Sequence, residues 1–322
     1  MPETRKIAAI VNPSAAGGKA GKRWPAMHCA LEQRLGPVTV RFTAANGHAT
    51  EITRELLGDG FNLIVAVGGD GTVNEIANGF LNRDVPVRPE ASLGILPVGT
   101  GSDLQRTLGI PPRFSDAVEL LANGRPVPID IGKTRFRARD ETIQDRYFVN
   151  LVSFGMGGAV AAGAKNFLRP LGGKIAFLWS TFIVLLRYHG RNVKLRLDGC
   201  AHEASYFVTN VAVGNGRYHG GGMHPCPTAV INDGMLEVTV IEYMSMLRLV
   251  YDIRVLYSEN VYRHPKTRHL RATSLSATGD PDTLIEIDGE PLGRLPLEIT
   301  LLPRRLPIVV SRNSPLAQPH SS

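Results

Sequence analysis

Cysteine is scarce in this chain of 322 residues, which contains three: Cys29, Cys200 and Cys226. They are odd in number, widely scattered and outside any CxxC or Cys/His spacing, which argues against a disulfide framework and a zinc site. Long apolar runs are also missing. The longest, residues 175–186, falls short of the about 20 residues that a membrane-spanning helix needs. We therefore expect no transmembrane span and a reducing, cytoplasmic compartment.

Negative charge is the minority, with 29 Asp and Glu against 36 Lys and Arg and a formal net charge of +7. This balance favours contact with phosphates or anionic membrane surfaces. Basic residues flank the apolar run, and residues 263–271 form a second basic segment. A core helix and a solvated loop are the commoner structures for such segments, and peripheral contact with a membrane is the alternative. Nothing resembles a nucleic-acid-binding pattern.

The first part of the chain alternates short apolar runs with amphipathic segments, which is typical of parallel βαβ units. Strands are predicted over residues 6–11, 62–69 and 92–99, and helices over 22–35 and 72–81. After Pro126, alternating β-branched runs are separated by glycine-rich turns, with helical candidates at 174–188 and 245–258. The sequence therefore predicts a doubly wound α/β domain over 1–128 and a mainly β domain over 129–300. A strand in 301–322 could return to the first domain.

The strongest functional signal is Gly68-Gly69-Asp70-Gly71-Thr72, between a buried strand and a helix. Glycines let a phosphate approach backbone N–H groups, and a helix N-terminus favours negative charge. Asp70 would repel a phosphate unless a cation lay between them, so its presence predicts Mg²⁺. A nucleotide site is predicted here, the alternative being an ordinary glycine turn.

Two further loops follow strands of the same domain. One is residues 99–103, and the other is Asn12-Pro13-Ser14 with the glycines and Lys19 after it. The second lacks the P-loop spacing, so Lys19 and Lys22 either contact phosphates or are solvated. Because ligands in open α/β sheets bind at the carboxyl ends of the strands, these loops are expected to converge on one crevice.

Together with the later segments GNGRYHGGGM, INDGMLEV and IDGEPL, these loops resemble the diacylglycerol kinase catalytic family. NAD kinases and phosphofructokinases have a similar glycine loop, but Asn74-Glu75 and Asp288-Gly289-Glu290 favour the lipid kinases. The resemblance implies a phosphofructokinase/NAD-kinase-like nucleotide domain and a β-sandwich-like second domain. It implies an enzyme that uses ATP and Mg²⁺ to phosphorylate a hydroxyl of diacylglycerol or a related lipid at a membrane surface.

The resemblance also implies roles for single residues. Asp288 is the general base, and Asp70 and Glu290 lie beside the metal or the nucleotide. The nucleotide-binding residues are Asn12, Pro13, Ser14, Thr43, Gly68, Gly69, Gly71, Thr72, Asn74, Glu75 and Thr100. A structural Mg²⁺ is bound by Asp233 and by the carbonyl groups of Val230 and Met235. Without the resemblance, Asp288-Gly289 indicates a hairpin turn with surface carboxylates.

Four positions depart from the family pattern: Ser102, Gly157, Thr228 and Asn232. Thr228 and Asn232 stand where relatives often carry carboxylates, which weakens the predicted structural metal site. These changes keep two alternatives open: an enzyme like the NAD kinases, and a degenerate protein that senses a nucleotide or a lipid. Edge strands in the β-rich domain also allow a homodimer.

Overall fold

The computed structural model describes residues 5–98, 102–167 and 188–317. Thr100 and the apolar run 175–186 lie outside the described residues. The chain forms two compact units. The first contains Met1–Ile131, Ile231–Gly234 and Leu302–Ser322, and the second contains Gly132–Val230 and Met235–Leu301. Two of the crossings between the units lie within long strands, β7 (Arg125–Ala138) and β16 (Glu290–Val310), and the other two flank the segment Ile231–Gly234.

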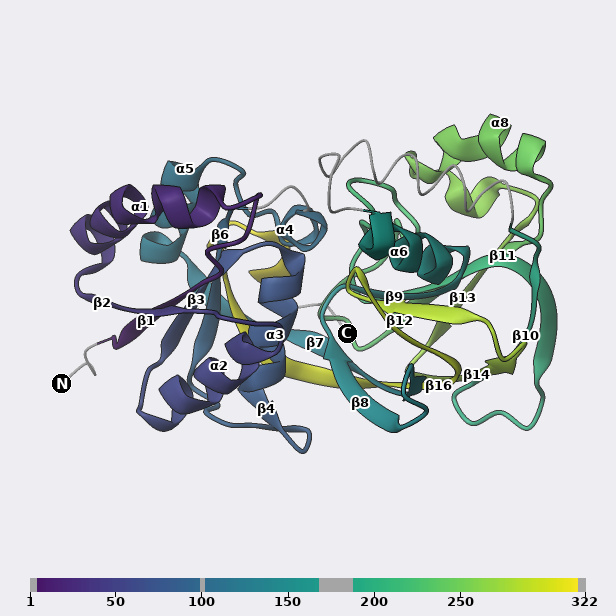
Figure 1. Cartoon of the computed structure of the whole chain (residues 1–322), viewed down its shortest axis with the longest axis horizontal. Helices are drawn as coiled ribbons and strands as arrows, with labels where there is room; N and C mark the ends of the chain where they lie inside the picture. The colour runs from purple at the N-terminus through teal and green to yellow at the C-terminus, as the bar shows by residue number, and fades with distance from the viewer. Residues whose placement is uncertain (1–4, 99–101, 168–187, 318–322) are drawn as a thin grey trace. The chain divides into compact units, whose positions relative to one another are not determined.

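The first unit is built on a parallel sheet in the order β2-β1-β3-β6 (Figure 1). Its strands are β1 (Ile7–Val11), β2 (Val38–Phe42), β3 (Leu63–Gly68) and β6 (Ser92–Pro97). Every residue of β1 and β3 is buried, as expected for central strands with helices on both faces. The end of β16 joins this sheet parallel to β6, with Ile308 opposite Leu93.

The helices of the first unit cover its sheet in two groups. They are α1 (Lys19–Leu35), α2 (His48–Gly58), α3 (Asp70–Phe80), α4 (Asp103–Leu108) and α5 (Phe114–Asn123). Helix α1 packs against α5, and α2 packs against α3. A short hairpin of β4 (Leu81–Asn82) and β5 (Val85–Pro86) follows α3. Helix α1 begins three residues before the predicted start at residue 22 and α3 two residues before residue 72.

The order of these strands locates the ligand-binding edge. The chain runs from β1 outward to β2 and then returns to β3 on the other side of β1, so the connections diverge between β1 and β3. Such a switch point is where open α/β sheets bind ligands, at the carboxyl ends of the strands. Asn12 directly follows β1, and Gly69 directly follows β3.

The second unit is antiparallel and branches at β11 (Ala204–Gly214). The first half of β11 pairs with β10 (Arg191–Leu197), and its second half pairs with β9 (Leu151–Gly155). The register shifts between Val208 and Asn210, where the two pairings meet. A bulge of this kind bends a strand, so β11 belongs to two layers, which enclose a core that includes Phe148, Phe154 and Leu297.

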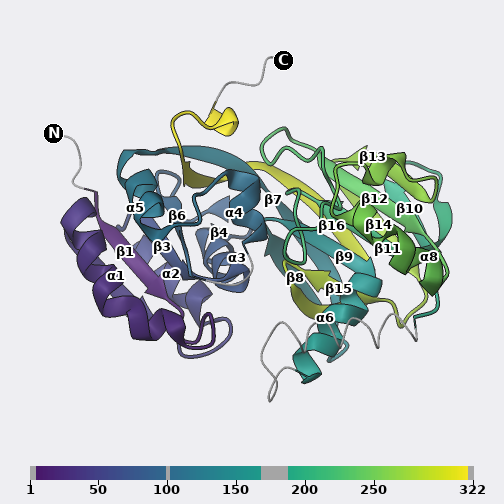
Figure 2. The ribbon, with the colours of Figure 1, turned by 90° about the horizontal axis from the view of Figure 1, so that it is seen from above.

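The remaining strands extend these layers. They are β8 (Ile143–Phe148), β12 (Leu236–Glu242), β13 (Thr267–Ala272), β14 (Ser274–Gly279) and β15 (Leu284–Ile287). Helix α6 (Met156–Phe167), which the sequence analysis missed, packs against β9 and β15 (Figure 2). Helix α8 (Met246–Leu256) matches the predicted candidate at 245–258. No helix among the described residues is long and apolar enough to cross a bilayer.

A fully buried carboxylate, Asp130, lies where β7 is still part of the first unit. Its two oxygens accept the N–H groups of Gly234 at 2.7 Å and Arg304 at 2.8 Å. Burial raises the pKa of Asp130 above its ordinary value, and the nearby charge of Asp233 adds to this, while the two N–H bonds act against it. The carboxylate joins three segments that are distant in sequence.

Asp130 is expected to make the stability of the first unit depend on pH. A carboxyl whose pKa is raised by folding binds more protons in the folded state. The contribution of Asp130 to the free energy of unfolding is therefore greatest below pH 3.8 and is lost as the pH rises through the folded-state pKa. The free energy of unfolding of the wild type, relative to Asp130→Asn, should fall by up to about 1.4 kcal/mol per pH unit in this window. Urea unfolding at several pH values measures it, with exposed Asp59→Asn as the control. A difference that stays constant or rises with pH would contradict the prediction.

Candidate functional site

The glycine turn after β3 is tied to the end of β1. The Asn12 side-chain amide donates to the Thr72 hydroxyl at 3.1 Å, and the Asn12 backbone N–H donates to the carbonyl of Val67 at 3.0 Å. A Cβ on Gly68 would lie 2.5 Å from the Thr72 hydroxyl oxygen. Gly68 is therefore required for packing within the turn, which brings Asn12 to the first turn of α3.

Gly69 differs from Gly68 because packing does not demand it. A Cβ added there meets no heavy atom within 4 Å, and its φ of −90° suits any residue. It precedes the N-terminus of α3, where backbone N–H groups lack helical partners. This combination leaves room for an anion at a helix N-terminus.

Asp70 begins α3 and contacts Ser102, in the loop that follows β6. One of its carboxylate oxygens accepts the backbone N–H of Ser102 at 3.0 Å. Ser102 immediately precedes α4 and has a φ of 120°, a conformation that L-residues rarely adopt. The loop after β3 is therefore joined through Asp70 to Ser102 of the loop after β6.

Other predicted nucleotide residues have structural partners in this unit. Ser14 donates its N–H to the Asn12 side chain, and Thr43 donates its N–H to the Val11 carbonyl. Asn74 is buried and accepts from the Asn78 amide. A Glu75 carboxylate oxygen accepts the Ala49 N–H at the start of α2. Asn12, Pro13, Gly69, Asp70 and Gly71 are half-buried, Ser14 is exposed and Thr72 is buried.

Asp288 lies in the second unit, in a two-residue turn between β15 and β16. Ile287 pairs with Glu290 across the turn, and both Asp288 and Gly289 have positive φ, 47° and 87°. Asp-Gly is the preferred pair for such a turn. The Asp288 carboxylate accepts three backbone N–H groups, from Val149 at 2.8 Å, Asn150 at 3.0 Å and Leu151 at 2.8 Å. These donors stabilise the ionised form and fix its orientation.

A second carboxylate, Glu286, lies on β15 two residues before Asp288 in the sequence. Glu286 is 2% exposed. It accepts from the Ser153 hydroxyl at 3.2 Å and lies 3.1 Å from Nε2 of His219. Glu290, the other predicted carboxylate, is half-buried at the start of β16.

The predicted structural metal loop offers few ligands. Asp233 and carbonyl oxygens suit a hard cation such as Mg²⁺. However, the described residues contain no group of three His, Cys, Asp or Glu that could hold a metal. The N–H of Gly234 in this loop donates to Asp130 instead, and the Asn232 amide donates to the Leu316 carbonyl at 3.2 Å. The predicted ligands, Asp233 and the carbonyl groups of Val230 and Met235, stay a prediction, and we assign them no chemical role.

The departure at Gly157 has a local explanation. A Cβ on Gly157 would lie 2.2 Å from the Ser153 hydroxyl oxygen, and the Gly157 N–H donates to the Asn210 side chain at 2.9 Å. An acidic side chain could not be placed here while Ser153 binds Glu286. Thr228 is exposed, and nothing in the structure explains its choice.

The basic segment 263–271 is largely neutralised. Glu242 pairs with Lys266 and Arg268, Glu237 pairs with His269 and Arg271, and His264 lies 3.1 Å from Asp252 of α8. Burial raises the pKa of Asp252, but hydrogen bonds from His264 and Arg248 outweigh this and lower it below its ordinary value. The segment therefore presents much less net positive charge than its sequence suggested.

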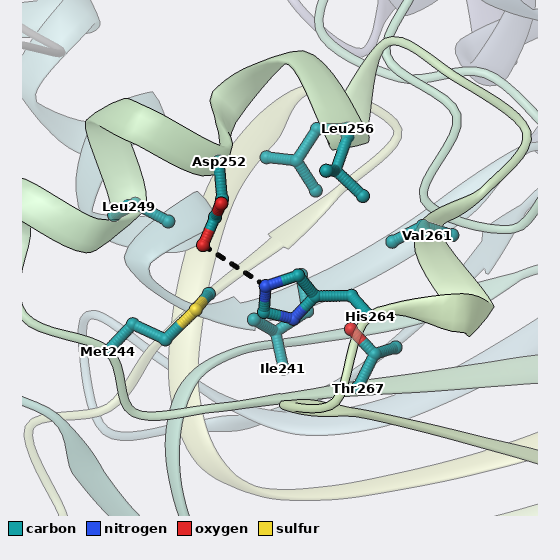
Figure 3. A pocket seen from close by; sticks show the side chains of 9 residues that line it. Ile241, Met244, Leu249, Asp252, Leu256, Val261, His264 and Thr267 are labelled. Carbon is teal, nitrogen blue, oxygen red and sulfur yellow. Dashed lines mark hydrogen bonds and ion pairs between the residues drawn. The ribbon is translucent and has the colours of Figure 1, made fainter.

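The His264–Asp252 pair lies in a small, mainly apolar pocket under α8 (Figure 3). Its lining includes Ile241, Met244, Leu249, Leu256 and Val261. None of the predicted site residues lines it. It is a packing feature of the second unit and supplies no chemistry to the candidate site.

Sequence reasoning missed the groups that hold Asp288, and it missed Asp130. Backbone N–H groups of Val149, Asn150 and Leu151 leave no trace in residue type. The Glu286 carboxylate had a signal in the alternation of apolar and acidic residues in LIEIDGE. Its partner His219 is 67 residues away in the sequence, so no local pattern links the two.

Comparisons with known proteins cover both units. The diacylglycerol kinase catalytic domain matches residues 6–134, and the YegS C-terminal NAD kinase beta sandwich-like domain matches residues 150–310. A curated protein of Enterobacter sp. (strain 638) named "Probable lipid kinase YegS-like" is 29% identical over 87% of this chain and 88% of its own length. A protein of the same name from Yersinia pestis (strain Pestoides F) is 28% identical over 86% and 88%.

Two solved structures resemble the fold. A diacylglycerol kinase of Bacillus anthracis (strain Sterne) superposes with a TM-score of 0.70 at 23% identity, covering 97% of this chain and 98% of the other. Yeast NADH kinase complexed with NADH superposes with a TM-score of 0.52 at 12% identity, covering 98% and 86%. The fold class predicted from the sequence is confirmed. With both family domains matched in order, the chain belongs to the diacylglycerol kinase family of YegS-like lipid kinases.

Proposed function

We propose that the protein transfers the γ-phosphoryl group of ATP to a hydroxyl of a lipid such as diacylglycerol, in a Mg²⁺-dependent reaction. The single observation that carries this proposal is the turn at Gly69, before the N-terminus of α3, where an added Cβ would meet no heavy atom of the described residues within 4 Å. Phosphates bind at such N-termini. The lipid acceptor is taken from the names of the relatives, which are lipid kinases.

Each group then has a defined part in the reaction. The N–H groups at the start of α3 bind phosphate oxygens, and Asp70 is the carboxylate assigned to Mg²⁺. The cation neutralises phosphate charge when it is bound with ATP. Asp288 accepts the proton of the lipid hydroxyl while the hydroxyl oxygen forms a bond to the γ-phosphorus. The bond from that phosphorus to the bridging oxygen breaks, and ADP leaves.

Orientation is the main task of Asp288 in this scheme. Phosphoryl transfer needs little covalent help from the protein, so placing the nucleophile accounts for much of the catalysis. A carboxylate held by three N–H groups is well oriented. Its oxygens have lone pairs left to accept a hydrogen bond from the hydroxyl.

The test is Mg²⁺-dependent transfer of label from ATP to a panel of lipids in mixed micelles, run beside NAD and the Asp288→Asn variant. A labelled lipid that disappears with the variant supports the proposal and identifies the acceptor. Label on NAD would assign the activity of the NAD kinases, whose fold is similar. ATP binding without transfer to either acceptor would favour the sensor.

A further inference from the structure

The segment that fixes Asp288 is itself held by a loop distant in sequence, residues 215–224. The Asn215 amide donates to the carbonyl of Val149 at 2.8 Å. The N–H groups of Asn215 and Gly216 both donate to the carbonyl of Asn150, at 2.9 and 2.8 Å. The Asn150 amide returns a bond to the carbonyl of Tyr218 at 2.9 Å. Loop 215–224 therefore determines where the three donors of Asp288 lie.

This loop has little means of holding itself. Gly220, Gly221 and Gly222 are consecutive and all have positive φ, at 60°, 84° and 117°. Glycine has the largest conformational freedom to lose on folding. The two backbone hydrogen bonds between His219 and Met223 close the turn. Outside the loop, Arg217 donates to the carbonyl of Ala229 at 2.8 Å and the His224 N–H donates to the carbonyl of Leu256 at 2.6 Å, but neither bond reaches the strand that leads to Asp288.

His219 provides an attachment to that strand. Its Nε2 lies 3.1 Å from the Glu286 carboxylate, with the imidazole 20% exposed and Glu286 2% exposed. A carboxylate buried so deeply is costly unless it is paired and hydrogen-bonded. The Ser153 hydroxyl donates to Oε2 of Glu286, and Oε1, which accepts no hydrogen bond among the described residues, lies beside the His219 imidazole. Because Ser153 pairs with Glu286 across β9 and β15, the acid is fixed to both strands.

The contacts close a ring. They run from Asp288 to Asn150, from Asn150 to Tyr218, along the chain to His219, and from His219 to Glu286 on β15, which ends at the residue before Asp288. We propose that His219 and Glu286 are positioning residues that hold loop 215–224, and through it the Asp288 carboxylate, in the geometry for phosphoryl transfer. The catalytic part of this inference rests on the proposed function.

The test compares His219→Ala, Glu286→Gln and their double variant by steady-state kinetics. Because no nucleotide residue is touched, we expect kcat for the lipid to fall about 10-fold with an unchanged KM for ATP. The double variant should lose no more than the worse single variant, since both break one pair. His219→Gln keeps an N–H donor and should recover most of kcat. His202→Ala and Glu298→Gln replace exposed residues of the same types and should match the wild type.

A second readout does not depend on activity. Amide hydrogen exchange at Val149, Asn150 and Leu151 should become about 10-fold faster in His219→Ala, because local opening governs exchange. In His219→Gln the exchange rates should return to those of the wild type. Unchanged exchange, a kcat within about twofold of the wild type, or additive losses in the double variant would overturn the inference. A wild type that phosphorylates no lipid would overturn the proposed function instead, and exchange would still decide the positioning role.

Discussion

Replacing Asp288 with asparagine is expected to lower kcat for lipid phosphorylation by about 10²–10⁴-fold, the usual contribution of a general base. Asparagine cannot accept the hydroxyl proton. Affinity for ATP should change little, because the residues assigned to the nucleotide belong to a different unit of the chain. Single-turnover transfer from labelled ATP measures the first quantity, and calorimetric titration with ATP measures the second.

The same substitution is also expected to lower the free energy of unfolding. One Asp288 oxygen accepts from Asn150 and Leu151, and the other accepts from Val149. An asparagine can keep the first pair, but its NH₂ group then faces the Val149 N–H. Leaving that donor without an acceptor should cost about 1–3 kcal/mol of unfolding free energy.

Asp198 provides a matched control in the same unit. It also precedes a glycine, with φ values of 48° and 67° for Asp198 and Gly199, and it accepts the N–H groups of Thr273 and Ser274 at 2.8 and 2.9 Å. Asp198→Ala and Asp288→Ala both orphan several donors, so both should lower stability. Only the second should abolish turnover. Equal activity in the two variants would remove Asp288 from the mechanism.

Gly69→Val is expected to weaken ATP binding by about 10–100-fold, the loss of one or two charge-assisted hydrogen bonds from backbone N–H groups to phosphate. The valine side chain would occupy the space that Gly69 leaves open at the N-terminus of α3. Thermal stability should stay close to the wild type, because the backbone conformation suits any residue. Calorimetric titration and a melting curve measure the two effects.

Two other glycines of the first unit make this result interpretable. Gly58, at the end of α2, also has no neighbour within 4 Å of an added Cβ, so Gly58→Val should leave ATP binding unchanged. Gly68→Ala should instead destabilise the protein, because its Cβ would overlap Thr72. If Gly69→Val binds ATP as tightly as the wild type, the nucleotide is not bound through this turn.

The predictable part of the fold was local. The continuous apolar run of β3 and the glycine turn after it determined the class of the first unit, because a strand buried on both faces needs helices on both sides. Alternation of apolar and polar residues, as in β16, likewise determined the class of the β-rich unit. Helix α6 escaped because Met156–Phe167 is rich in glycine and alanine and shows no clear amphipathic period.

The candidate site could be predicted only at residues whose type carries the chemistry. Asp288 was found by its motif, and Gly69 by its position between a strand and a helix. The three N–H groups that hold Asp288 belong to Val149, Asn150 and Leu151, and a backbone donor is the same in every residue except proline. Asp130 and His219 acquire meaning only from partners that the fold brings to them. The domain limits, the metal ligands and the partners remain predictions.

The return of β16 to the first unit has a consequence for synthesis in the cell. Residues up to Ile131 leave the ribosome well before the strand that ends at Val310 and pairs with β6. At about 5–20 residues per second, the interval lasts about 10–40 s. During this time the β6 edge of the parallel sheet lacks its final neighbour, and an open edge is a template for pairing with other chains. Completion of the parallel sheet is thereby coupled to synthesis of the second unit.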